Sequence, residues 1–148
     1  MEIRTYRKEE TQKLGQTTGN HLIKAGKKEK PQVLTLYGEL GSGKTTFVQG
    51  LAKAIGIPRR IVSPTFILMR RYPLTIKNFS WLYHIDLYRL ETEADLADLG
   101  LPEIFADPAA IVAIEWAERL KPSLPKNRTD ISFTIKNEER KILIKEIF

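Results

Sequence analysis

Glycine, lysine and threonine are closely spaced in residues 38–45, whose sequence is GELGSGKT. The segment fits the pattern G-x-x-x-x-G-K-[ST], in which a curled backbone points its N–H groups at phosphate oxygens. In this pattern Lys44 reaches the β- and γ-phosphates, and the Thr45 hydroxyl binds Mg²⁺. The segment therefore predicts a site for a nucleoside triphosphate. The residues that we expect to bind the nucleotide here are Gly38, Leu40, Gly41, Ser42, Gly43, Lys44, Thr45 and Thr46.

The residues on both sides of this loop have the patterns that such a loop requires. Residues 33–37 (VLTLY) form an apolar and β-branched run of strand length. After the loop, Phe47, Leu51 and Ile55 recur at helical spacing. A helix that begins at Lys44 adds the partial positive charge of its N-terminus to the phosphate site. The order of strand, loop and helix supports a phosphate-binding function.

Two carboxylates are candidates to serve this loop, because a Mg²⁺-dependent triphosphatase needs acidic groups near the metal and the attacking water. Glu115 directly follows residues 110–114 (AIVAI), which resemble a buried strand of a parallel sheet. Asp86 lies in the strand-like run 79–90. Functional groups of such sheets gather beyond the carboxyl ends of the strands. The alternative is an ordinary strand-end acid for Glu115 and a surface residue for Asp86.

Two further residues lie beside these acids in the sequence. His84 is two residues before Asp86, so a strand places both on one face. A lone histidine favours a packing or orienting role over that of a general base. Trp116 follows Glu115 and is interpreted as a core residue or as a cover over the site.

The remaining chain predicts a single α/β domain over residues 1–148 with a mixed sheet. Residues 2–6 alternate like an edge strand, and residues 8–25 have a helical pattern that ends at Gly26. Within that helix Gly15 and Gly19 indicate close packing, against a backbone neighbour or a nucleotide base. Antiparallel hairpins are expected from residues 66–72 with 79–90 and from residues 130–136 with 141–148, and a short helix is expected over 92–99 with Thr92 as its N-cap.

Composition excludes several other kinds of site. The 148 residues contain no cysteine, which excludes disulfides, thiolate metal sites and a cysteine nucleophile. The two histidines make a histidine-rich metal site improbable. No apolar run has the roughly 18 residues of a membrane helix, and the charged N-terminus has no signal-peptide core, so we expect a cytoplasmic protein without membrane contact.

The net charge of +6 permits a nucleic-acid partner without requiring one. Basic residues are concentrated in the pairs Arg59-Arg60 and Arg70-Arg71, with Lys77 nearby. They form either a solvated basic surface or a surface that contacts a nucleic-acid backbone or an acidic partner. Salt dependence of nucleic-acid binding distinguishes these alternatives, because phosphate contacts weaken with added salt.

Beyond the phosphate loop, several segments together resemble the TsaE (YjeE) family of small bacterial ATPases of tRNA threonylcarbamoyladenosine biosynthesis. The resemblance covers roughly residues 8–118, with a looser match to the end. The matching segments are ETQKLG (10–15), GELGSGKTT (38–46), SPTF (63–66), HIDLYRL (84–90), LGLPE (99–103) and IEW (114–116). Only the phosphate loop is specific by itself, whereas the ordered set is highly specific.

The resemblance implies a P-loop NTPase-like, three-layer domain with a mixed, mainly parallel sheet. It implies an ATPase that works with the TsaD and TsaB proteins, which install threonylcarbamoyl on N6 of adenosine 37 in tRNAs that read codons beginning with A. The implied cofactors are ATP or ADP and Mg²⁺. By the same resemblance Thr45 and Glu115 bind Mg²⁺, and Lys44, Asp86 and Glu115 are the catalytic residues.

Further roles follow from the same resemblance. The segment 63–66 acts as a nucleotide-sensing switch, Thr11 lies by the adenine, and Arg140 contacts the nucleotide. Ser42 stands where many members have alanine, a change expected to be harmless because the loop binds phosphate through its backbone. No arginine is clearly placed to stabilise the transferred phosphoryl group, although Arg89 follows Asp86 closely. We therefore expect slow hydrolysis alone and faster hydrolysis with TsaD and TsaB.

Three alternative functions remain open. A small-molecule kinase has the same loop, but the chain has no clear arginine-rich lid and little room for one. A GTPase is suggested by residues 127–130 (NRTD), but these follow a loop, and no D-x-x-G segment is suitably placed. In the third alternative the protein is a non-catalytic scaffold in which bound ATP only stabilises an assembly.

Overall fold

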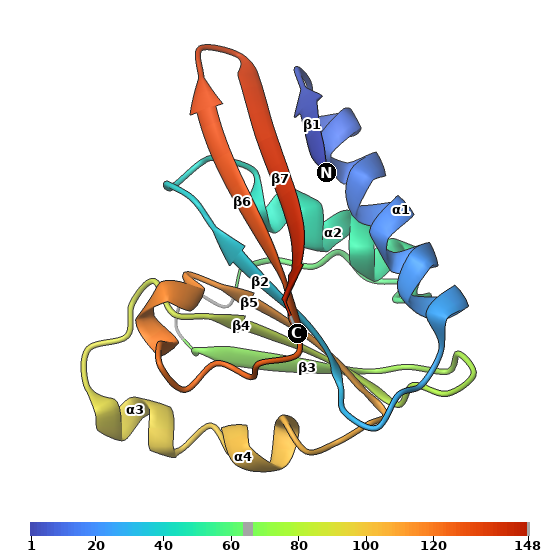
Figure 1. The fold of residues 1–148 in the computed structure, drawn as a ribbon, viewed down its shortest axis with the longest axis vertical. Coiled ribbons are helices and arrows are strands. Elements are labelled where there is room, and N and C mark those ends of the chain that lie inside the picture. Colours follow the sequence, from blue (N-terminus) through green and yellow to red (C-terminus); the bar gives the residue numbers. More distant parts are fainter. Residues whose placement is uncertain (64–66, 148) are drawn as a thin grey trace.

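The structure is a computed structural model that describes residues 1–63 and 67–147. Within these residues the chain forms one seven-stranded sheet with the order β1-β7-β6-β2-β5-β4-β3 (Figure 1). The strands are β1 (Glu2–Thr5), β2 (Gln32–Tyr37), β3 (Met69–Pro73), β4 (Trp81–Asp86), β5 (Ala110–Glu115), β6 (Arg128–Lys136) and β7 (Glu139–Ile147). The helices are α1 (Lys8–Ala25), α2 (Lys44–Ala54), α3 (Glu93–Ala97), α4 (Leu101–Ile104) and the 3₁₀ helix η1 (Ala117–Leu120).

The centre of the sheet is parallel and its margins are antiparallel. Strands β6, β2, β5 and β4 are joined by the parallel pairings β2–β6, β2–β5 and β4–β5. The pairings β3–β4, β6–β7 and β1–β7 are antiparallel. The predicted α/β fold with a mixed sheet and two hairpins is thus confirmed, and the parallel core aligns the carboxyl ends of three strands that carry predicted site residues.

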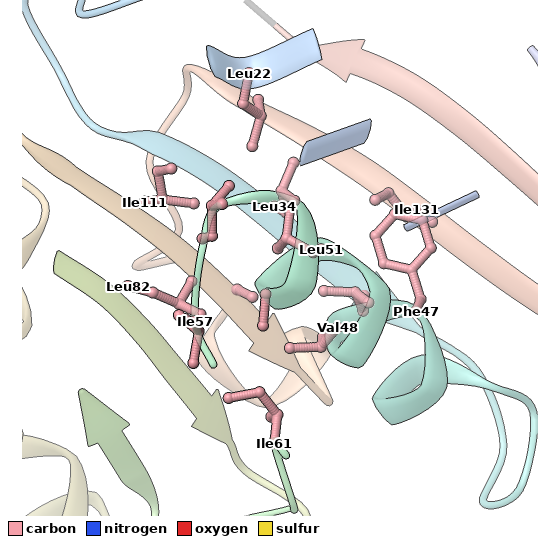
Figure 2. Packing of buried hydrophobic residues seen from close by; sticks show 14 of the residues in the cluster. Leu22, Leu34, Phe47, Val48, Leu51, Ile57, Ile61, Leu82, Ile111 and Ile131 are labelled. Atoms are coloured by element: carbon pink, nitrogen blue, oxygen red, sulfur yellow. The ribbon is translucent and has the colours of Figure 1, made fainter. Parts of the chain in front are cut away.

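Helices cover both faces of the sheet, which gives the predicted three layers. On one face α1 and α2 pack on the central strands, and Figure 2 shows Val48 and Leu51 of α2 over Leu34 of β2. On the other face Leu101 of α4 and Leu120 of η1 are buried in a second apolar cluster. Every residue of β5 is buried because this strand is covered on both faces, as its uninterrupted apolar sequence predicts.

Two strand predictions differ from the structure. The strand expected over residues 79–90 ends at Asp86, where the chain turns and the Tyr88 amide donates to the Asp86 carboxylate. The strand begins at Trp81 rather than at Phe79, which lies before it and packs in the cluster under α2 with Leu82. The strand expected over residues 66–72 begins at Met69, and position 66 lies outside the described residues.

The glycines of α1 allow this helix to pack closely against α2. A Cβ atom at Gly15 would lie 2.1 Å from the Phe47 carbonyl oxygen of α2, and one at Gly50 of α2 would lie 1.9 Å from the Gln12 carbonyl oxygen of α1. At Gly19 the neighbouring atoms likewise belong to α2. The expected close packing is therefore against a backbone neighbour, and it fixes α1 against the helix that follows the phosphate loop.

We predict that Gly50→Ala destabilises the protein by about 1–3 kcal/mol, because the added methyl group overpacks the contact between α1 and α2. At an open helical position the same change is expected to stabilise by about 0.4–1 kcal/mol, so the sign of the effect is diagnostic. Urea unfolding measures the free energy of unfolding, with Asn20→Ala on the exposed side of α1 as the control. A Gly50→Ala variant as stable as the parent contradicts the packing described here.

Candidate nucleotide site

The carboxyl ends of β2, β4 and β5 meet at one cavity of about 550 Å³. β2 leads into the glycine-rich loop, β4 ends at Asp86 and β5 ends at Glu115. Asp86 and Glu115 are register partners on adjacent strands. The cavity is lined by Lys8, Thr11, Leu40, Gly41, Gly43, Lys44, Thr45, Thr46, Ser63, Asp86, Tyr88, Arg89, Glu115, Trp116 and Arg140.

The glycine-rich loop curls as its sequence predicts. Gly43 has φ 109° and directly precedes α2, whose first residue is Lys44, and this left-handed conformation favours glycine. The loop is closed by a hydrogen bond of 3.1 Å from the Ser42 amide to the Glu39 carbonyl. The N-terminus of α2 therefore faces the cavity that Gly41 and Gly43 line, as phosphate binding at a helix N-terminus requires.

Lys44 is held against the loop itself. Its Nζ atom donates to the Gly38 carbonyl oxygen and, at 3.0 Å, to the Glu39 carbonyl oxygen. The side chain is buried, and burial lowers the pKa of the Lys44 ammonium, although the carboxylates of Glu115 and Asp86 oppose the shift. Two backbone carbonyl groups thus hold the positively charged ammonium group of Lys44 beside the cavity, where it can bind a phosphate.

Trp116 covers this lysine. The Lys44 Nζ atom lies 4.4 Å from the centre of the indole ring, and Tyr88 packs on the ring with a centroid distance of 5.0 Å. Trp116 has φ 57°, a left-handed conformation that typically costs a non-glycine residue about 1–3 kcal/mol. Trp116 also packs against the second apolar cluster, so it combines the two roles considered for it, cover and core residue.

Glu115 and Thr45 are in direct contact. The Thr45 hydroxyl donates to the Glu115 carboxylate, with Oγ1 at 2.9 Å from Oε1 and 3.1 Å from Oε2. The second carboxylate oxygen, Oε2, lies 2.6 Å from Nε2 of His84. These hard oxygen atoms suit Mg²⁺, which binds to one or two protein groups together with substrate phosphates and water. Residues 1–63 and 67–147 contain no cluster of three or more His, Asp or Glu side chains that would hold a metal alone.

The Asp86 carboxylate accepts two hydrogen bonds from neighbouring residues of the cavity. Its Oδ2 atom accepts a hydrogen bond of 2.5 Å from the Ser63 hydroxyl, and its Oδ1 atom accepts one of 3.0 Å from the Tyr88 amide. The Asp86 side chain is buried rather than part of an exposed strand face. Ser63 opens the segment predicted to be a nucleotide-sensing switch, and the other three residues of that segment lie outside the described residues.

Thr11 and Arg140 line the cavity on the outer side of the loop. A Cβ atom at Gly43 would lie 3.4 Å from Cγ2 of Thr11 and 3.6 Å from Cδ of Arg140. Arg140 also donates weakly to the Gly41 carbonyl at 3.5 Å. The structure therefore brings residues from α1 and β7 to the phosphate loop, and their contact with the nucleotide stays a prediction.

Gly38 and Ser42 do not line the cavity. Gly38 instead provides a carbonyl group to Lys44. The Ser42 hydroxyl is buried and has no partner among the described residues, which typically costs about 1–3 kcal/mol.

Sequence reasoning missed two residues that line the cavity, Lys8 and Tyr88. Lys8 is the first residue of α1, three positions before Thr11, so helical spacing was a usable signal. Tyr88 lies in the turn after β4. It was assigned to a continuing strand, and no local pattern indicated the turn.

The predicted basic surface is divided between two faces of the edge strand β3. The Arg59 guanidinium lies 5.9 Å from the ring centre of Tyr72, which packs in the cluster under α2. The Arg71 guanidinium lies 4.3 Å from the ring centre of Trp81, which packs against the opposite cluster. Contact between these arginines and tRNA stays a prediction.

Comparisons with known proteins were made with the whole chain. The family model "Threonylcarbamoyl adenosine biosynthesis protein TsaE" matches residues 5–142. A relative from Bacillus subtilis, the "tRNA threonylcarbamoyladenosine biosynthesis protein TsaE", is 40% identical over 128 residues, which span 86% of this chain and 73% of the relative. A relative of the same name from Nostoc sp. is 42% identical over 135 residues, which span 88% of this chain and 76% of the relative.

The fold also matches a solved structure. The crystal structure of YdiB from Bacillus subtilis has a TM-score of 0.77 and 33% sequence identity, covering 100% of this chain and 86% of that chain. The likeness supports the P-loop NTPase-like fold. Among the described helices, none is long and apolar enough to cross a membrane.

Proposed function

The chain belongs to the TsaE family of threonylcarbamoyl adenosine biosynthesis proteins, and from this premise we propose that it is a Mg²⁺-dependent ATPase. Its hydrolysis of ATP supports threonylcarbamoylation of adenosine 37 in tRNAs that read codons beginning with A. One observation carries the proposal: Lys44, Glu115 and Asp86 converge on the cavity that the phosphate loop lines. Residues 1–148 act as one P-loop ATPase domain in this proposal, since both apolar clusters share strands of one sheet.

The phosphate loop and Lys44 bind the triphosphate. Backbone N–H groups of residues 41–46 surround its oxygens, and Lys44 exchanges the carbonyl groups of Gly38 and Glu39 for the β- and γ-phosphates. Leu40 and Thr46 line the same cavity. Thr11 and Arg140 lie on the outer side of Gly43, where we place the nucleoside portion.

Thr45 and Glu115 are the proposed Mg²⁺ ligands, since their oxygen atoms are in contact and face the cavity. The cation supplies positive charge to the phosphate oxygens. Asp86 has a different role, because its described hydrogen bonds join it to Ser63 and Tyr88, whereas Thr45 is bonded to Glu115. We propose that Asp86 orients the water that attacks the γ-phosphate.

Proposed partners are the TsaD and TsaB proteins, in the cytoplasm, where the tRNA substrate is modified. An incomplete catalytic site supports the need for partners. Arg89 lines the cavity but is exposed at its edge, so no buried guanidinium is fixed beside Lys44 among the described residues. A partner that places an arginine there, or orders Arg89, would complete the stabilisation of the phosphoryl group.

We predict that the purified protein hydrolyses ATP slowly and that TsaD and TsaB together accelerate it, up to the factor of about 10³–10⁵ that a well-placed arginine supplies. Phosphate release is measured with Mg²⁺ and with EDTA, with and without both partners. Equal rates with and without the partners contradict partner stimulation. Release that is unaffected by EDTA contradicts the metal assignment.

A further inference from the structure

His84 is buried beside the metal site but does not line the cavity. Its side chain is 0% exposed and that of Glu115 is 3% exposed, and Nε2 of His84 lies 2.6 Å from Oε2 of Glu115. His84 lies on β4 and Glu115 on β5, which are neighbouring parallel strands. His84 therefore contacts the proposed cation ligand from behind, without access to nucleotide or water in the cavity.

The hydrogen bond assigns the tautomer of the imidazole ring. An ionised carboxylate only accepts hydrogen bonds, so Nε2 of His84 carries the proton. The other ring nitrogen, Nδ1, is buried and has no partner among the described residues. The geometry thus makes Nε2 of His84 the donor to Glu115.

This contact distinguishes the two oxygen atoms of Glu115. Thr45 lies within 3.1 Å of both, so the Thr45 hydroxyl alone does not select one orientation of the carboxylate. The terminal torsion of a glutamate is soft and roughly two-fold, so a free carboxylate exchanges its oxygens readily. His84 forms a hydrogen bond with Oε2, so that Oε1 is the oxygen atom that lies beside Thr45 and the cavity.

We infer that His84 is a positioning residue that holds Glu115 in the orientation required to bind the divalent cation. The inference rests on the proposed function in one respect, the assignment of Glu115 as a cation ligand. Partners behind a metal ligand typically affect metal affinity by about 10–100-fold when they are removed. His84 acts through Glu115, and its effect must disappear when Glu115 no longer binds the cation.

The test measures Mn²⁺ binding to the protein–ADP complex by electron paramagnetic resonance, a readout that needs no hydrolysis. Mn²⁺ is suitable because it accepts the same oxygen ligands as Mg²⁺. We expect His84→Leu to raise the Mn²⁺ dissociation constant by about 10-fold or more, the range for removal of such a partner. His84→Gln, whose longer amide reaches the position of Nε2, is expected to restore most of the affinity. If His84→Leu does not fold, His84→Asn, whose amide is too short to reach Glu115, replaces it.

The matched control is Ile85→Val, which alters a buried β4 side chain on the opposite face of the sheet and leaves Glu115 untouched. It is expected to leave Mn²⁺ binding unchanged. A double-mutant cycle then tests the route of the effect: in a Glu115→Gln background, His84→Leu should change the affinity by less than about twofold, because the two residues act as one unit.

Three results overturn the inference. The first is a His84→Gln variant as weak as His84→Leu, and the second is a full effect of His84→Leu in the Glu115→Gln background. The third is a normal affinity of Glu115→Gln alone, which also removes the metal assignment in the proposed function. In contrast, a protein that shows the expected Mn²⁺ binding pattern but never hydrolyses ATP contradicts the proposed function and leaves the role of His84 intact.

Discussion

Replacing Asp86 with alanine is expected to leave ATP bound and to reduce hydrolysis by about 10²–10⁴-fold, the usual contribution of a group that handles the attacking water. Binding is retained because none of the described hydrogen bonds of Asp86 joins it to the phosphate loop. Its partners are the Ser63 hydroxyl and the Tyr88 amide. Calorimetry measures ATP affinity, and single-turnover phosphate release measures the chemical step.

Two further variants make this result specific. Asp86→Asn keeps the volume of the side chain and an acceptor for the Tyr88 amide, so its loss of turnover reports the missing carboxylate rather than a collapsed turn. Asp98→Asn removes an exposed carboxylate outside the cavity and should behave like the parent. Normal hydrolysis by Asp86→Ala would show that Asp86 has been assigned wrongly.

Replacing Lys44 with alanine is expected to weaken ATP binding about 10- to 150-fold. This range corresponds to about 1.5–3 kcal/mol for hydrogen bonds to a charged group, at 1.4 kcal/mol for each factor of ten. The change removes the only lysine at the start of α2, where the loop and the helix N-terminus already favour an anion. Titration calorimetry with ATP and with ADP measures the loss, which should be larger for ATP because Lys44 reaches the γ-phosphate.

The control for Lys44 is Lys53→Ala, which removes a lysine from the exposed side of the last turn of the same helix. It changes the net charge equally and should leave the affinity for ATP close to that of the parent. Thermal unfolding of the Lys44→Ala variant separates lost phosphate contacts from a disturbed loop, because Lys44 also bridges the carbonyl groups of Gly38 and Glu39. A folded Lys44→Ala variant with normal affinity would contradict the phosphate-binding role.

Local patterns in the sequence predicted much of the fold. The helix over residues 8–25 has the predicted bounds, because its apolar residues recur at helical spacing and Gly26 ends it. The strand Ala110–Glu115 was recognisable because burial on both faces demands an uninterrupted apolar run. The phosphate loop was also recognisable from local sequence, because all of its glycines, its lysine and its threonine lie within one segment of the chain.

The contacts between segments could not be predicted in this way. The hydrogen bond between His84 and Glu115 joins residues 31 positions apart, and it exists because β4 and β5 are neighbours. The cation–π contact between Lys44 and Trp116 depends on a left-handed backbone conformation that a tryptophan rarely adopts. Side-chain alternation also extended β4 too far, because the hydrogen bond that ends the strand at Asp86 leaves no trace in the hydrophobic pattern.

The contacts of the site also bear on the alternative functions, a scaffold and a small-molecule kinase. A scaffold that only binds ATP needs the phosphate loop and Lys44 but has no use for the Asp86 carboxylate that Ser63 holds in the same cavity. A small-molecule kinase needs a site for its acceptor, and phosphate transfer to such an acceptor in place of water would reveal one. Hydrolysis and binding must therefore be separated in an assay of the pathway itself.

The most direct measurement of that kind is formation of threonylcarbamoyladenosine on tRNA by TsaD and TsaB with a threonylcarbamoyl donor, ATP, Mg²⁺ and either the parent protein or Asp86→Asn. The proposed function predicts sustained tRNA modification with the parent and little with Asp86→Asn, although both bind ATP. Full modification with an Asp86→Asn variant that does not hydrolyse ATP would contradict it and would show that bound ATP is sufficient.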